Sequence, residues 1–200
     1  EQFVNWRWIA ERVRRAAVAG PRPSPPNSED AGSPPREGEK TRVLNLFAYT
    51  GGSTLAAAAA GAEVTHVDAS KPSVTLARRN AEQSGLADAP VRWIVEDAVR
   101  YCQREVKRGD RYDAVILDPP TYGHGPKGEE WRLARDLPKL LSLVAELTDG
   151  RPLFLLVTCH TPGVGPAELG AYLADGVFGS CAQPPNTGEL YLVTKEGRRL

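Results

Sequence analysis

The chain has 200 residues, of which 41% are hydrophobic and 25% charged, and these fractions exclude a disordered or fibrous protein. Its 25 basic and 25 acidic side chains cancel, so the net charge gives no indication of a nucleic-acid partner. No apolar run approaches the roughly 20 residues of a membrane span, and three scattered cysteines exclude a disulfide framework, so we expect a cytoplasmic, reducing location.

The N-terminal part is predicted to be an amphipathic helix over residues 1–19, followed by a flexible linker over residues 20–40. Six prolines and no large apolar residue in the linker leave too little surface to bury. A single α/β domain is expected over residues 41–200. Because the chain begins at Glu1 and contains no methionine, we expect it to be a piece of a longer protein. The helix is indicated by apolar residues at helical spacing, namely Phe3, Trp6, Ile9, Val13 and Ala17.

Beyond residue 40, apolar strand patterns and helix patterns alternate. This alternation predicts a parallel sheet covered by helices on both faces, an α/β fold of the Rossmann-like type. The expected strands are 43–47, 63–67, 91–95, 112–117 and 153–158, with a last strand at 189–194. The expected helices are 53–60, 71–84, 98–107, about 129–147 and 167–174.

Ligands of such sheets bind outside the carboxyl ends of the strands, so we expect the site in the loops that follow them. The first loop ends in Gly51 and Gly52, which permit a tight turn and a close approach of a ligand to the backbone. It lacks the glycine spacing of dinucleotide folds and the lysine of a phosphate-binding loop, which argues against NAD and ATP.

Three acidic residues close the next three strands. Asp68 is placed to accept the hydroxyl protons of a ribose, and Asp97 is placed to accept a hydrogen bond from an exocyclic amine. The alternative is that Asp68 caps the helix near Pro72 and that Asp97 caps the helix after it. Asp118 opens the run Asp-Pro-Pro-Thr-Tyr, in which Pro119 and Pro120 stiffen the loop and Tyr122 presents a ring. A simple rigid turn is the alternative.

These loops together resemble the class I S-adenosylmethionine-dependent methyltransferases, and more narrowly the large-subunit rRNA methyltransferases. The matching segments are Leu44–Gly51, Val67–Ser70, Ala77–Asn80 with Gly85 and Leu86, Asp97–Ala98, Asp118–Tyr122 and Asp136–Leu140. The resemblance implies a methyltransferase domain over residues 41–200, with S-adenosylmethionine as cofactor and an antiparallel last strand.

By the same resemblance, Tyr49 to Gly52 pack the methionine part of the cofactor. The implied cofactor-binding residues are Phe47, Tyr49, Thr50, Gly51, Gly52, Asp68, Ser70, Asp97 and Asp118. The implied catalytic residues, which would hold the methyl acceptor, are Asp118, Pro119, Pro120 and Tyr122. No metal site is expected.

Two chemistries remain open. A base nitrogen needs only positioning, with Asp118 and the Pro119 carbonyl as hydrogen-bond acceptors. Cytosine C5 needs a cysteine thiolate that attacks C6 first. Cys159 is the candidate nucleophile, although alignment on Gly163 places Thr161 at that position and a small core role is the alternative.

The expected substrate is an RNA base, most simply of ribosomal RNA. A small molecule or a protein side chain is the alternative acceptor, and a silent cofactor-binding scaffold is a third possibility. Trp6 and Trp8 either stack on a base or pack the first helix onto the domain. Four basic residues near the Asp118 loop either contact phosphates or form a solvated helix face: Lys127, Arg132, Arg135 and Lys139.

Overall fold

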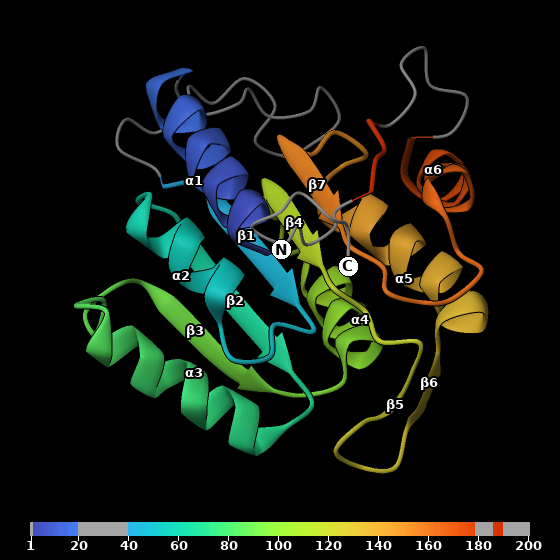
Figure 1. Cartoon of the computed structure of the whole chain (residues 1–200), viewed down its shortest axis with the longest axis horizontal. Helices are drawn as coiled ribbons and strands as arrows, with labels where there is room; N and C mark the ends of the chain where they lie inside the picture. Colours follow the sequence, from blue (N-terminus) through green and yellow to red (C-terminus); the bar gives the residue numbers. More distant parts are fainter. Residues whose placement is uncertain (1, 20–39, 179–185, 190–200) are drawn as a thin grey trace, which may run out of the picture.

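A computed structural model describes residues 2–19, 40–178 and 186–189 of the chain. Within them, five strands form one sheet in the order β3-β2-β1-β4-β7, and every neighbouring pair is parallel (Figure 1). The predicted Rossmann-like sheet is therefore confirmed, whereas the expected last strand at 189–194 lies outside the described residues except for Glu189. The strands are β1 (Arg42–Leu46), β2 (Glu63–Asp68), β3 (Val91–Val95), β4 (Ala114–Leu117) and β7 (Phe154–Val157).

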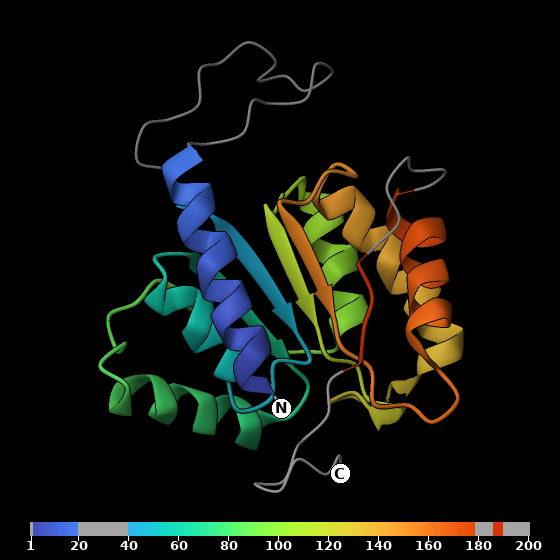
Figure 2. The ribbon, with the colours of Figure 1, turned by 45° about the horizontal axis from the view of Figure 1, so that its top comes forward.

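Helices cover both faces of the sheet, as the alternating pattern predicted (Figure 2). One face carries α1 (Gln2–Ala19), α2 (Gly52–Ala59) and α3 (Lys71–Gln83). The other face carries α4 (Ala98–Arg108), α5 (Leu133–Leu147) and α6 (Pro166–Leu173), which continues into one π-helical turn, Ala174–Phe178. None of the described helices is long and apolar enough to cross a lipid bilayer.

Successive strand residues point to opposite faces and so feed two separate cores. Val115 and Leu117 of β4 belong to the core under α4, α5 and α6, whereas Ala114 and Ile116 belong to the core under α1 and α2. Since both of its faces are buried, β4 is a continuous apolar run. We predicted a strand over 112–117, but β4 begins only at Ala114. Tyr112 precedes it, and its N–H donates to the Leu147 carbonyl of α5.

The first helix belongs to this packing. Ile9 and Val13 are fully buried against the sheet, and the Trp8 ring meets Phe154 edge-on at 5.3 Å between centroids. Phe3, which we expected on the buried face, is 63% exposed. It lies one turn before Trp6, and the contact with the domain begins at Trp6, whose ring covers Gly52. The expected linker, residues 20–40, lies outside the described residues apart from Lys40.

A short hairpin after the Asp118 loop was not predicted. It pairs β5 (Tyr122–His124) with β6 (Glu130–Arg132) in antiparallel fashion, so α5 begins at Leu133 and not near residue 129. Arg132 stays extended because its N–H donates to the Asp136 carboxylate, 2.8 Å away, which satisfies a free donor at the start of α5. The hairpin thereby carries Tyr122 beyond the edge of the main sheet.

A buried polar cluster joins β1, β2 and α2. Asn45 Nδ2 donates to Thr54 Oγ1 at 2.9 Å, and the same hydroxyl lies 2.9 Å from His66 Nδ1. His66 is fully buried, and desolvation lowers its pKa from 6.5 to about 4. The folded protein therefore holds this imidazole neutral.

This burial predicts a loss of stability in acid. Between pH 6.5 and 4 the unfolded chain binds a proton at His66 and the folded chain does not, so the free energy of unfolding falls as the pH falls. We expect about 2 kcal/mol of the loss between pH 7 and pH 5 to come from this residue. Urea unfolding at both pH values measures it, and a His66→Gln variant should lack that share. An equal loss in the variant would contradict the assignment.

Candidate active site

Five loops follow the parallel strands and lie at one edge of the sheet, where all the strand arrows end (Figure 1). The strand order reverses between β1 and β4, since β2 and β3 lie on one side of β1 and β4 and β7 on the other. Ligands of open parallel sheets bind at this reversal. The loop after β1 and the Asp118 loop after β4 flank it directly.

The first loop has an unusual backbone. Phe47 and Tyr49 have positive φ values of 55° and 47°, and Gly51 adopts φ 91° as the N-cap of α2. Each such non-glycine residue costs on the order of 1–3 kcal/mol, and such strain concentrates at functional sites. A side chain of α3 stabilises this loop: Asn80 Nδ2 donates to the Thr50 carbonyl at 2.9 Å.

Asp68 ties the first loop to the second. Its Oδ2 accepts the Tyr49 N–H and its Oδ1 accepts the Ser70 N–H, both at 2.8 Å. The alternative in which Asp68 caps α3 is wrong, because Ser70 is the N-cap and accepts from Ser73 N–H. The carboxylate is half-buried, and its acceptor-only chemistry suits a ligand that carries hydroxyl donors.

Asp97 follows β3 in a more buried position. It is 9% exposed, and its Oδ1 accepts the Arg100 N–H, so the structural alternative of a cap on α4 is confirmed. A hydrogen bond from Glu96 N–H to the Asp68 carbonyl places this loop beside the second one. Capping uses one oxygen of the carboxylate, and a role toward an exocyclic amine stays a prediction.

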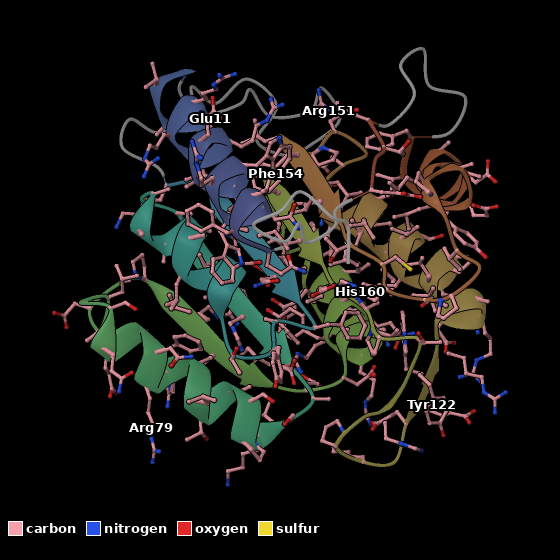
Figure 3. The ribbon with its side chains drawn as sticks, in the orientation of Figure 1. Glu11, Arg79, Tyr122, Arg151, Phe154 and His160 are labelled. Carbon is pink, nitrogen blue, oxygen red and sulfur yellow. The ribbon has the colours of Figure 1, made fainter. Side chains whose placement is uncertain are left out.

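The Asp118 loop is braced on two sides. Asp118 Oδ1 accepts from Thr158 Oγ1 and lies 3.5 Å from His160 Nε2, while 41% of the Asp118 side chain stays exposed. Pro119 is buried, and the exposed Pro120 accepts the Trp131 Nε1–H at 2.7 Å through its carbonyl. The carboxylate is thus fixed yet accessible. Figure 3 shows His160 and Tyr122 toward the edge where the strands end.

The first helix also reaches this edge of the sheet, and its contacts bear on the two roles that the sequence left open for Trp6 and Trp8. A Cβ on Gly52 would lie 2.4 Å from the Trp6 ring, so Trp6 packs directly on the start of α2. Packing is therefore the role that the structure gives both Trp6 and Trp8, whose ring also carries Arg12 at 5.0 Å from its centroid. The helical spacing of Trp6 with Ile9 and Val13 was the signal for this contact.

The structure gives contacts for the cysteines and for two of the basic residues. Val157 and Cys159 pack against the core under α5, whereas Thr158 between them faces Asp118. Cys102 is fully buried, and Cys181 lies outside the described residues. Arg132 and Arg135 are paired with Glu130 at 3.0 and 3.2 Å, so a local carboxylate already shares their charge.

Within the described part of the chain, no three His, Cys, Asp or Glu side chains cluster as metal ligands. Oxygen acceptors, tight backbone turns and an aromatic ring make up the site instead. This composition fits an organic ligand with hydroxyl and amine donors.

Curated proteins with similar sequences are named as rRNA methyltransferases. Over 85 residues, 42% of the chain, it is 39% identical to the ribosomal RNA large subunit methyltransferase I of Aeromonas hydrophila, of which it covers 21%. Over 118 residues, 55% of the chain, it is 36% identical to the ribosomal RNA large subunit methyltransferase K/L of Shewanella loihica, of which it covers 16%. The chain thus spans about a fifth of the length of such relatives.

A solved structure of a known methyltransferase has a similar fold. The crystal structure of the S-adenosylmethionine-dependent methyltransferase from Agrobacterium tumefaciens superposes with a TM-score of 0.75 at 38% identity, over 90% of this chain and 51% of that one. The sequence profile of the family described as S-adenosylmethionine-dependent methyltransferase matches residues 36–175, well over half of the chain. This chain therefore belongs to the S-adenosylmethionine-dependent methyltransferase family.

Proposed function

We propose that the chain transfers a methyl group from S-adenosylmethionine to a base of RNA, most simply of ribosomal RNA. The observation that carries this proposal is the position of two braced carboxylates at the strand reversal. Asp68 ends β2 and Asp118 follows β4, and these two strands are the neighbours of β1. The names of the relatives supply the RNA substrate class.

The chain's residues fit this cofactor. Gly51 and Gly52 allow α3 and α1 to pack closely on the first loop, since a Cβ on them would meet Ala77 at 3.0 Å and Trp6 at 2.4 Å, and this packing holds the loop in its turn. In the proposal, Asp68 accepts the ribose hydroxyls and Asp97 the adenine amine, with Tyr49 to Gly52 along the methionine part. When bound, S-adenosylmethionine supplies an electrophilic methyl group on sulfur.

The acceptor half works by positioning. A methyl transfer needs an acceptor lone pair held in line with the methyl carbon, and fixed groups supply this without further chemistry. In the proposal, Asp118 and the Pro119 carbonyl accept hydrogen bonds from an N–H group of the base, and Tyr122 stacks on its ring. The bracing of Asp118 by Thr158 supports this role.

A heteroatom acceptor fits better than cytosine C5. The C5 route needs a thiolate in the pocket, and Cys159 turns toward the core under α5 while Thr158 turns toward Asp118. The thiol of Cys102 is buried, and burial raises its pKa far above neutrality. The core contact of Cys159 and the burial of Cys102 support the heteroatom acceptor in this proposal.

This orientation predicts that a Cys159→Ser variant keeps its methyl transfer rate within about threefold, because a serine side chain is nearly isosteric and this thiol takes no part in the reaction. The measurement is incorporation of tritiated methyl groups into RNA. A complete loss of turnover with unchanged thermal unfolding would instead identify Cys159 as a nucleophile.

The proposed function itself is tested with unmodified rRNA transcripts. The chain and tritiated S-adenosylmethionine are incubated with large-subunit transcripts, and the digested nucleosides are analysed by mass spectrometry. We expect one methylated nucleoside that is absent without enzyme. Label in ribosomal protein or in small molecules of a cell extract, and not in RNA, would favour the alternative acceptors. Cofactor binding without any transfer would favour a scaffold.

A further inference from the structure

The buried polar cluster at the start of α2 contains none of the residues assigned to the cofactor or to the acceptor. It consists of Asn45 of β1, Thr54 of α2 and His66 of β2, all at most 2% exposed. The parallel register pairs Asn45 with His66, so their side chains lie next to each other on one face of the sheet. Thr54, in the first turn of α2, contacts both of them. We call these three side chains the Thr54 cluster.

One hydroxyl group connects the two strands. Asn45 Nδ2 donates to Thr54 Oγ1 at 2.9 Å, so the hydroxyl accepts on that side. Its own hydrogen is directed at His66 Nδ1, also 2.9 Å away, which agrees with a neutral imidazole that accepts at this nitrogen. Among the described residues His66 has no other hydrogen-bond partner, since its Nε2 is buried and unpaired beside the Trp93 ring. Without the hydroxyl, both Asn45 Nδ2 and His66 Nδ1 lose their partner.

The Thr54 cluster joins the two ends of the first loop. Asn45 lies two residues before Phe47, and Thr54 lies three residues after Gly51, so the bond from Asn45 to Thr54 closes the loop at its base. The loop needs such support. Phe47 and Tyr49 have positive φ values, and strained backbone of this kind persists only where surrounding contacts over-determine it.

The Thr54 cluster also joins the first loop to the strand that ends in Asp68. His66 lies two residues before Asp68 in β2, so its bond with Thr54 holds the start of α2 in place relative to that carboxylate. Packing does not require polar side chains here. The other buried residues of α2 are Ala57 and Ala58, which pack on the sheet through apolar contact. The polar contact of α2 with the sheet therefore lies in the turn next to the first loop.

We propose that Thr54 is a positioning residue for S-adenosylmethionine, because its hydroxyl, held between Asn45 and His66, keeps the first loop in the shape that receives the cofactor. The inference rests on the proposed function, which places the methionine part of the cofactor along Tyr49 to Gly52 and its ribose at Asp68. Thr54 is fully buried, so it acts through the loop and not by contact with the cofactor. A loop that adopts the binding shape for only a fraction of the time binds with a correspondingly higher apparent Kd.

The test removes the hydroxyl and keeps the branched shape of the side chain. Thr54→Val leaves Asn45 Nδ2 and His66 Nδ1 unpaired, and we expect its Kd for S-adenosylhomocysteine, measured by titration calorimetry, to rise about tenfold, the order of one buried hydrogen bond. Thr54→Ser keeps the hydroxyl and should stay within about twofold of the unaltered chain. An unchanged Kd in Thr54→Val, or an equal rise in both variants, overturns the proposal.

Thr148→Val is the matched control. Thr148 is also a buried threonine, and its hydroxyl donates to the Val144 carbonyl in the last turn of α5, near the beginning of β4 and away from the first loop. Both valine variants should lose thermal stability, but only Thr54→Val should lose affinity for S-adenosylhomocysteine. A similar rise of the Kd in Thr148→Val would trace the effect to general destabilisation and overturn the proposal.

A milder variant covers the case in which Thr54→Val does not fold. Asn45→Ala deletes one of the two bonds of the hydroxyl and leaves the one with His66. We expect its Kd for S-adenosylhomocysteine to rise about fivefold. An unchanged Kd in this variant also overturns the proposal.

Two further measurements separate positioning from a loss of structure. On rRNA transcripts, Thr54→Val should raise the KM for S-adenosylmethionine about tenfold and keep kcat within about threefold, because bound cofactor restores the loop. In hydrogen exchange, peptides that cover residues 46–52 should exchange faster in Thr54→Val and return to the rate of the unaltered chain when S-adenosylhomocysteine is added. A lost kcat with normal KM, or unchanged exchange, overturns the proposal.

These outcomes keep the Thr54 cluster and the proposed function apart. If Asp68→Ala weakens S-adenosylhomocysteine binding and Thr54→Val does not, only the positioning inference fails. If neither variant changes the affinity, the proposed place of the cofactor fails together with it. If Thr54→Val binds as expected and no RNA is methylated, the RNA substrate fails and the positioning role remains.

Discussion

An Asp118→Asn variant is expected to lose methyl transfer by at least about 100-fold, because misplacing a reacting group by about 1 Å already costs that much. The amide keeps the size of the carboxylate, but one of its acceptor oxygens becomes a donor. Either the bond from Thr158 or the proposed bond from the acceptor base then loses its acceptor. Initial rates with tritiated S-adenosylmethionine and rRNA transcripts measure the loss.

The variant should still bind the cofactor product. We expect its affinity for S-adenosylhomocysteine to stay within about tenfold, since Asp118 is one polar contact among several. Asp88→Asn is the matched control, because Asp88 is exposed in the loop before β3. Full transfer activity in Asp118→Asn would remove Asp118 from the proposed acceptor site.

An Asp68→Ala variant is expected to weaken S-adenosylhomocysteine binding by about 1–3 kcal/mol, the range for stripping a partner from buried polar groups. The loss has two physical sources. The ribose hydroxyls lose their proposed acceptor, and the N–H groups of Tyr49 and Ser70 lose the carboxylate that now holds the first and second loops together. Titration calorimetry measures the affinity.

A second variant separates these sources. Asp68→Asn keeps one carbonyl acceptor for the loops and should bind more tightly than Asp68→Ala but more weakly than the unaltered chain. Thermal unfolding of each variant checks that the fold persists. If calorimetry shows the same affinity for all three proteins, the ribose role of Asp68 is wrong.

Much of the fold followed from local pattern. The strands β1 and β4 are short apolar runs between turn residues, and both are buried on the two faces of the sheet because they lie at its centre. The amphipathic repeat likewise predicted a helix where α1, Gln2–Ala19, lies. These features are written in consecutive residues, so no knowledge of distant contacts was needed.

Local pattern was insufficient where a residue's role depends on a distant partner. Glu130 to Arg132 looked like the start of a helix, but pairing with Tyr122 to His124 and a bond from Trp131 to Pro120 make them a strand. Asp68 had the local pattern of a helix cap, yet Ser70 takes that role and Asp68 reaches the first loop.

By itself the amino-acid sequence determined the alternation of elements, and with it the edge at which the strand-end loops gather, because strand direction and side-chain period are local properties of the chain. Only the tertiary structure decided which way Cys159 turns, what braces Asp118, and which side chains meet in the Thr54 cluster. Those outcomes depend on side chains up to about 40 residues apart, such as Asp118 and Thr158, whose meeting is a result of packing.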